Sequence, residues 1–253
     1  MKYAAKLSYD GSQFCGWQKQ KDIAGATIQD TFEKALAILD GGNVPVTVAG
    51  RTDKGVHAAG QVASFSMSRY WEPGKLRNAL DANLPESVTV LRVLEVPDNF
   101  SARHSALWRE YIYFVWKEHG CPPHIKPYVW KNTSFWDYGR IREACSAIKG
   151  EHDFGAFCRL GDRPENSVRT VTKVDFSARG PLCRVRVRGK SFLTNMVRII
   201  LGSVDLVGTG KRDISWLESL LQGKSREEAG PTAPAKGLFL WKVGYGDTSL
   251  DRS

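Results

Sequence analysis

The residues best suited to chemistry form one octet, Gly-Arg-Thr-Asp-Lys-Gly-Val-His at residues 50–57. Within it Asp53 stands between two cations, Arg51 and Lys54, and glycines bracket the group. A carboxylate can act as a nucleophile or as a general base, and loops at strand ends often present such groups. An exposed charge cluster without any chemical role fits the same pattern. The octet therefore makes Asp53 a candidate catalytic residue and leaves both interpretations open.

Two other segments carry side chains that could contact a substrate. Tyr111 and Tyr113 point the same way if residues 111–116 form a strand, and a tyrosine in a basic setting can stack on an unpaired base. Both tyrosines fit equally well as core aromatics. Arg198 interrupts an apolar helical stretch, where a buried arginine would need an anionic partner such as an aspartate from another segment. A small rotation of that helix would instead place Arg198 in water.

Metal and cofactor chemistry find little support. The five cysteines include no C-x-x-C pair, and His119, Cys121 and His124 are close in sequence without an evident fourth ligand. The chain contains no phosphate-binding glycine loop, no dinucleotide fingerprint, no zinc-protease motif and no serine nucleophile elbow. An enzyme with this sequence is expected to work in the cytoplasm without a metal or an organic cofactor. Its first residues do not form a signal peptide and no apolar run approaches the length of a membrane span, so no membrane association is expected.

The composition indicates a polyanionic partner. Of the 253 residues, 42% are apolar and 25% are charged, as is usual for globular proteins. Lysine and arginine number 36 against 27 acidic residues, and the formal net charge of +9 suits nucleic acid. Arg184, Arg186 and Arg188 alternate with valines, so one face of a strand would enter the core and the other would face water or phosphate. A basic protein with no specific partner is the other interpretation.

Hydrophobic periodicity predicts two similar halves. The first hundred residues predict strand, helix, strand, strand, helix and strand, at residues 3–9, 28–39, 44–49, 60–67, 76–84 and 88–94. Thr27 is expected to cap the first of these helices. The same scheme follows at residues 111–116, 138–148, 171–176, 183–188, 192–207 and 238–243. This order is typical of ferredoxin-like units, so we expect an α+β protein with halves at residues 1–100 and 101–253.

With these blocks in view, the sequence resembles the TruA family of tRNA pseudouridine synthases. Residues 50–57 fit the family's G-R-T-D-x-G-V-H motif at every fixed position. Four more blocks fit in family order, namely the opening residues 9–18, the R-x-Y-x-Y segment at 109–113, the F-L-x-x-M-V-R-x-I-x-G helix at 192–202 and the closing segment at 232–238. Ser101 departs from the family, which more often has histidine or asparagine there, and the departure concerns a contact at the substrate edge.

The resemblance implies a cofactor-free isomerase that converts uridine to pseudouridine in the anticodon stem-loop of tRNAs, at positions thirty-eight to forty. It implies that the target nucleotide is flipped out of its helix. It also implies the pseudouridine synthase fold, in which two ferredoxin- or RRM-like halves join into one mixed, mainly antiparallel sheet flanked by helices. A homodimer that holds one tRNA between its subunits is expected on the same basis.

The resemblance also assigns roles to individual residues. Matched by motif, Asp53 corresponds to the catalytic aspartate, Tyr111 to the tyrosine that stacks on the target base, and Arg198 to the basic residue that pairs with the aspartate. Arg51 corresponds to the arginine that enters the space left by the flipped nucleotide. The residues that would hold phosphates are Lys19, Lys21, Arg184, Arg186, Arg188 and Lys190.

Two other functions are alternatives to catalysis. A tRNA-binding module on the same fold would be expected to have lost Asp53 or Arg198, and both are present. An RRM-like RNA binder needs paired aromatics in RNP-type strands, of which Tyr111 and Tyr113 offer only a weak version.

Overall fold

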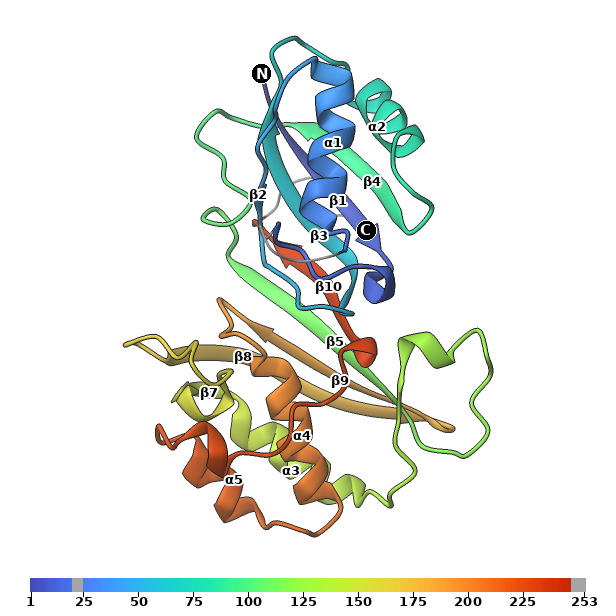
Figure 1. Ribbon diagram of the computed structural model, residues 1–253. Coiled ribbons are helices and arrows are strands. Elements are labelled where there is room, and N and C mark those ends of the chain that lie inside the picture. Colours follow the sequence, from blue (N-terminus) through green and yellow to red (C-terminus); the bar gives the residue numbers. More distant parts are fainter. Residues whose placement is uncertain (20–24, 247–253) are drawn as a thin grey trace. The chain divides into compact units, whose positions relative to one another are not determined.

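The computed structural model describes residues 1–19 and 25–246, and the chain divides into two compact units (Figure 1). The first unit comprises Met1–Arg109 and Phe239–Ser253, and the second comprises Glu110–Leu238. The last strand thus returns to the first unit, which the expected halves at residues 1–100 and 101–253 did not include. Lys21, one of the residues expected to contact phosphate, lies outside the described residues.

The described residues of the first unit form a mixed sheet with two helices. Its strands are β1 (Lys2–Tyr9), β2 (Thr47–Val48), β3 (His57–Ser66), β4 (Val88–Glu95) and β10 (Leu238–Gly244), and its helices are α1 (Ile28–Asp40) and α2 (Pro73–Ala82). The strand order is β4-β1-β3-β10, with β2 also paired to β3. β1 is antiparallel to β3 and β4, and β2 is antiparallel to β3, whereas β10 runs parallel to β3. The predicted β-α-β-β-α-β order of the first hundred residues is therefore confirmed.

Helix α1 begins where the sequence pattern places it. The side chain of Thr27 accepts a hydrogen bond from the Asp30 amide at 3.3 Å, which satisfies a donor that the first turn would otherwise leave unpaired. Phe32, on the buried face of α1, contacts Phe65 of β3 edge to face, with ring centroids 5.7 Å apart. Burial of this apolar face against the sheet holds the helix in place.

The strands on either side of the octet differ from the prediction. The strand expected at residues 44–49 is reduced to β2, because Pro45 has no N–H to give to a ladder. Val44 is nevertheless buried. The strand expected at residues 60–67 already begins at His57, the last residue of the octet. The loop that carries Asp53 is therefore the connection of a β-hairpin between β2 and β3.

The second unit contains five strands and three helices. The strands are β5 (Trp108–Trp116), β6 (Trp130–Lys131), β7 (Gly150–Asp153), β8 (Val168–Arg179) and β9 (Leu182–Gly189), and the helices are α3 (Tyr138–Ile148), α4 (Met196–Gly208) and α5 (Ile214–Leu220). The strand order is β5-β9-β8-β7, with β6 paired in parallel to β5. β8 is antiparallel to both of its neighbours. Helix α3 contacts β8, α4 and α5.

Helix α4 is shorter than the expected helix at residues 192–207. It begins at Met196, because Asn195 takes the left-handed conformation with a φ of 62° and so interrupts the helical backbone. Phe192 and Leu193 precede the helix. The seven-residue helix α5 was not predicted, since so short a segment shows little periodicity.

The α+β class and the mixed, mainly antiparallel strand pairing agree with the sequence prediction. Within residues 1–19 and 25–246, none of the helices has both the length and the apolar character needed to cross a bilayer.

Candidate active site

Asp53 lies half-buried in the loop between β2 and β3. Its carbonyl oxygen accepts a hydrogen bond from the Val56 amide at 3.1 Å, which closes a tight turn. The side chain of Val56 is buried beneath that turn, whereas Arg51 and Lys54 are exposed. The loop thus keeps a carboxylate at the edge of the protein interior with two cations beside it in sequence.

The opening segment holds this loop through its backbone. The Trp17 amide donates to the carbonyl oxygen of Thr52 at 3.0 Å, and the Trp17 ring is itself buried. A β-carbon on Gly16, which has a φ of 95°, would lie 2.9 Å from the same carbonyl oxygen. Glycine is therefore needed at residue 16 for both its backbone conformation and the close approach. This contact explains why the Gly-Trp pair accompanies the Asp53 motif.

Buried polar side chains of the neighbouring strands hold the loop through hydrogen bonds. The Tyr9 hydroxyl is 2.8 Å from the Thr52 hydroxyl, and burial raises the pKa of Tyr9 to about 12, so this tyrosine stays neutral. The amide of Gln61 donates to the Gly50 carbonyl oxygen at 2.7 Å and to the Tyr9 hydroxyl at 3.3 Å. Arg109 donates from Nε and Nη2 to the Ala49 carbonyl oxygen, at 3.0 and 2.9 Å. The chain on the N-terminal side of Asp53 is therefore held at Ala49, Gly50 and Thr52.

Two of these supporting residues were missed by the sequence reasoning. Gln61 sits among small and apolar residues of β3, and Arg109 was noted only as the first letter of a motif. A buried amide or guanidinium needs acceptors, and loop carbonyls supply them here. For Gln61 the signal was a polar residue inside the strand expected at residues 60–67, whereas Arg109 lies before the strand expected at residues 111–116.

Tyr111 and Phe192 meet in the second unit. Their rings are edge to face, with centroids 5.1 Å apart, and Tyr111 keeps 8% of its surface exposed. Tyr113, on the same face of β5, is fully buried and its hydroxyl donates to the Pro234 carbonyl oxygen at 2.6 Å. Burial raises the pKa of Tyr113 well above its usual range. Tyr113 is thus a core residue, while Tyr111 lies at the margin of the core.

Arg198 on α4 is half-buried and held in a defined orientation. Its Nε donates to the Ala233 carbonyl oxygen at 2.8 Å and its Nη1 donates to the Asn195 side chain at 3.3 Å. The Ala233 amide in turn donates to the Arg198 carbonyl oxygen at 3.1 Å. The closing segment and the arginine helix, which are separate blocks in the sequence, therefore form one structural unit.

The arginines of β9 are divided in their contacts. Val185 and Val187 are buried, as the alternation predicted. On the opposite face, Arg188 donates from Nε and Nη2 to one oxygen of Glu110 at 2.9 and 2.7 Å, and Arg186 lies 3.9 Å from the other. Glu110 itself is buried, so it needs these cations. Arg184 donates to the Ser177 hydroxyl at 3.2 Å. Of the three arginines it lies nearest to the turn between β8 and β9.

Lys19 is engaged on the surface of the first unit. Its amine lies 2.8 Å from a carboxylate oxygen of Asp30, and this hydrogen bond raises the pKa of Lys19. Such an exposed pair contributes little to stability.

Each unit therefore brings together part of the predicted site. The first unit places Asp53 and Arg51 in one anchored loop, and the second places Tyr111 beside Phe192 and ties Arg198 to the closing segment. Asp53 and Arg198 belong to different units, so their pairing stays a prediction. In the part of the chain that the structure describes, no three His, Cys, Asp or Glu side chains are grouped to hold a metal ion.

Comparison with known proteins decides the family. The family model described as "tRNA pseudouridine synthase" matches residues 4–105 and 144–246. The chain belongs to the tRNA pseudouridine synthase family. The resemblance noted in the sequence is thereby confirmed, and with it the class of enzyme, an isomerase.

Relatives in this family match nearly the whole chain. "tRNA pseudouridine synthase A" of Geobacillus kaustophilus is 40% identical over 256 residues, covering 98% of this chain and 95% of the relative. The proteins of the same name from Bacillus subtilis and Pseudothermotoga lettingae are each 38% identical and are covered over 99% of their length. The similarity thus extends over nearly the whole chain, and both ranges matched by the family model include residues of the candidate site.

Proposed function

We propose that this enzyme converts uridine to pseudouridine in the anticodon stem-loop of tRNAs, at positions thirty-eight to forty, with Asp53 as the catalytic residue. The observation that carries the proposal is the Asp53 loop, whose backbone is held by Trp17, Gln61 and Arg109. A loop fixed at this many points gives a reacting group the defined position that catalysis requires. An exposed charge cluster would not need such support.

The reaction rearranges one glycosidic bond. The N1–C1′ bond of the uridine breaks, the uracil turns, and C5 then bonds to C1′ while the C5 proton leaves and N1 gains a proton. Asp53 could attack C1′ as a nucleophile, or it could remove the 2′ proton to give a glycal. Both routes need an ionised carboxylate. A nearby cation favours that form, which is the role proposed for Arg198.

The target uridine must leave its helix before it can react. Turning a nucleotide out of the stack costs a few kcal/mol. Tyr111, which lies at the margin of the core with 8% of its surface exposed, would recover part of that cost by stacking on the free base. Arg51, exposed in the same loop as Asp53, would occupy the space that the base leaves.

The remaining surface would bind the tRNA backbone. The formal net charge of +9 suits a polyanion, and Arg184 with Lys19 and Lys190 would contact phosphates. Arg186 and Arg188 would do so while held by Glu110. We further propose that the enzyme acts as a cytoplasmic homodimer, with one tRNA held between the subunits and no cofactor.

The test is release of tritium from C5-labelled uridine in unmodified tRNA. We expect the wild-type enzyme to release it, and D53N and D53A to release none while keeping tRNA affinity within about tenfold, since one carboxylate adds little to phosphate binding. The matched control is D98N, which makes the same change at an exposed aspartate of the first unit. Equal activity in D53N and wild type would reject the role of Asp53, and tRNA binding without release by any variant would favour a binding module.

A further inference from the structure

We propose that Leu160 is a substrate-contacting residue, which packs against a base of the RNA beside the target nucleotide. This inference rests on the proposed function and names a further part of the same site. It is drawn from the loop at residues 158–167 of the second unit, here called the 158–167 loop. The loop is fixed at both ends, presents one bare apolar side chain, and is joined to the segment that carries Phe192 and leads to Arg198.

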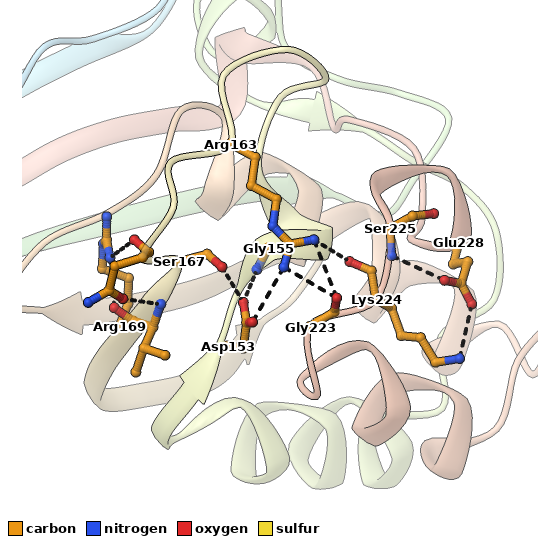
Figure 2. A network of polar contacts seen from close by, with 11 residues as sticks. Asp153, Gly155, Arg163, Ser167, Arg169, Gly223, Lys224, Ser225 and Glu228 are labelled. Carbon is orange, nitrogen blue, oxygen red and sulfur yellow. Dashed lines mark hydrogen bonds and ion pairs between the residues drawn. The ribbon is translucent and has the colours of Figure 1, made fainter.

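The base of the 158–167 loop is held by Asp153 and Arg163 (Figure 2). One oxygen of Asp153 accepts from the Gly155 amide at 2.8 Å and from the Ser167 hydroxyl at 2.5 Å, which ties the two stems together. The other oxygen lies 3.4 Å from Nη2 of Arg163. Arg163 also donates to the carbonyl oxygens of Gly223 and Lys224, at 3.2 to 3.3 Å. The loop is therefore a supported structure rather than a free connection.

The tip of the loop is a closed turn. The Asp162 amide donates to the Arg159 carbonyl oxygen at 3.0 Å, and the side chains of the same two residues form an ion pair at 2.9 Å. Leu160 lies inside this turn with 72% of its surface exposed. The backbone hydrogen bond and the ion pair hold the turn that presents Leu160 at the tip of the loop.

The tip is attached to the candidate site of the same unit. The Arg159 amide donates to the carbonyl oxygen of Thr194 at 3.0 Å. Thr194 stands between Phe192, which contacts Tyr111, and Asn195, which contacts Arg198. Leu160 is thus one residue away from a direct hydrogen bond to the segment that contacts Tyr111, which is expected to stack on the target base, and Arg198, which is expected to pair with Asp53.

The surroundings of Leu160 favour RNA over a second copy of the chain. A stable protein interface buries about 800 Å² on each partner around a continuous apolar centre. Leu160 is instead flanked in sequence by charged residues, namely Arg159, Asp162, Arg163 and Glu165. Two of these residues are basic and two are acidic, and Arg159 and Arg163 are paired with Asp162 and Asp153, so the local charge does not select the partner. A single apolar side chain on a fixed loop tip suits nucleic acid, because apolar wedges such as leucine contact or separate base steps.

The experiment uses the whole enzyme and a tRNA anticodon stem-loop. Binding is followed by the fluorescence of 2-aminopurine placed next to the target uridine, in the inactive D53N background, and turnover by tritium release in the active background. We expect wild-type Leu160 to raise the fluorescence by unstacking or enclosing the probe, and L160A to lose most of that rise. We expect L160A to lower kcat/KM by about tenfold, while L160M stays near wild type, because the effect scales with apolar contact.

The controls separate this idea from other causes. F135A removes an even more exposed apolar side chain of the second unit, 83% accessible, and should change neither signal. R163A keeps the Leu160 side chain but removes the contacts that hold the base of the loop, so it should give an intermediate loss. If L160A matches wild type in both signals, or if it changes the oligomeric state of the enzyme in solution, the inference is wrong. If the wild-type enzyme releases no tritium, the proposed function fails instead.

Discussion

Arg109 donates two N–H groups to the carbonyl oxygen of Ala49, a residue sixty positions earlier in the sequence. The same guanidinium donates to the Ala106 carbonyl oxygen at 3.2 Å and to that of Arg103. Ala49 is the last residue before the octet that carries Asp53, and Arg109 is buried. One buried cation therefore links the start of the Asp53 loop to the segment that leads into β5.

This link predicts that Arg109 positions Asp53 without touching substrate. Lysine in R109K can donate to Ala49 from a single nitrogen and cannot reproduce the planar fork of the guanidinium. We expect kcat to fall by about tenfold or more, because small displacements of a reacting group are costly, while tRNA affinity stays within about twofold. Steady-state kinetics and equilibrium tRNA binding measure the two quantities. R103K, at an exposed arginine nearby in sequence, should change neither. A loss of affinity with unchanged kcat would contradict the assignment.

A second relationship concerns α4 and the closing segment. A β-carbon on Gly202 would lie 1.8 Å from the carbonyl oxygen of Pro231. No rotation of a side chain can relieve such a clash with backbone, so alanine must push the closing segment away from the helix that carries Arg198.

We therefore expect G202A to lower the free energy of unfolding by about 1–3 kcal/mol or more, as overpacking of a core does. It should also lower activity, since Ala233 would no longer hold Arg198. Chemical denaturation and the tritium-release assay measure the two effects. The matched control is G120A in the same unit, where the added methyl group meets nothing within 4 Å. Equal stability of G202A and G120A would show that the closing segment adapts freely.

How far the sequence predicts this structure depends on the kind of interaction. Helix α3 matches its expected range of residues 138–148, because its apolar periodicity is local and Asp137 caps it. Thr27 caps α1 for the same local reason. The predicted start of α4 was wrong because Asn195 takes the left-handed conformation, which interrupts the helix. Asparagine tolerates that conformation but does not require it, so the sequence alone did not reveal the interruption.

The candidate site likewise has one part that local sequence could predict and another part that it could not. Asp53 could be located from its loop and flanking charges, and the family motif added its role. The groups that hold the loop come from β1, β3 and β5, so their convergence on the loop is set by strand pairing over long sequence separations. No local pattern shows that Gln61 reaches Gly50 or that Arg109 reaches Ala49. The function of the buried polar residues is thus the part that needed the structure.

Lys117 gives a prediction about pH. Its amine is buried and lies 4.1 Å from the centre of the Trp136 ring, whose N–H donates to Asp205 at 2.7 Å. Burial lowers the pKa of Lys117 to about 8 from its ordinary value of 10.5. Between these two values the unfolded chain binds more protons than the folded one, so the free energy of unfolding gains a positive slope with pH.

We expect K117M, which keeps the length of the side chain without its charge, to lack this contribution. The stability of K117M relative to wild type should therefore fall as the pH is raised from 8 to 10, since only wild type gains from losing the buried proton. Denaturant unfolding at several pH values measures the difference. K131M, at an exposed lysine of β6, should follow the wild-type slope. Parallel curves for K117M and wild type would show that the buried amine is not the cause.

The pairing of Arg198 with Asp53 can be tested through the pH dependence of activity. If Arg198 keeps the carboxylate ionised, R198L should lose activity most strongly at low pH, and the acid limb of kcat/KM should move toward neutral pH by about one pH unit or more. R198K keeps a cation at the site and should restore part of the shift. Because Arg198 also donates to Ala233, unfolding of each variant must be measured alongside, and R212L serves as a control for the loss of an exposed charge in the same unit. An acid limb of R198L that coincides with that of wild type would show that the two residues do not pair.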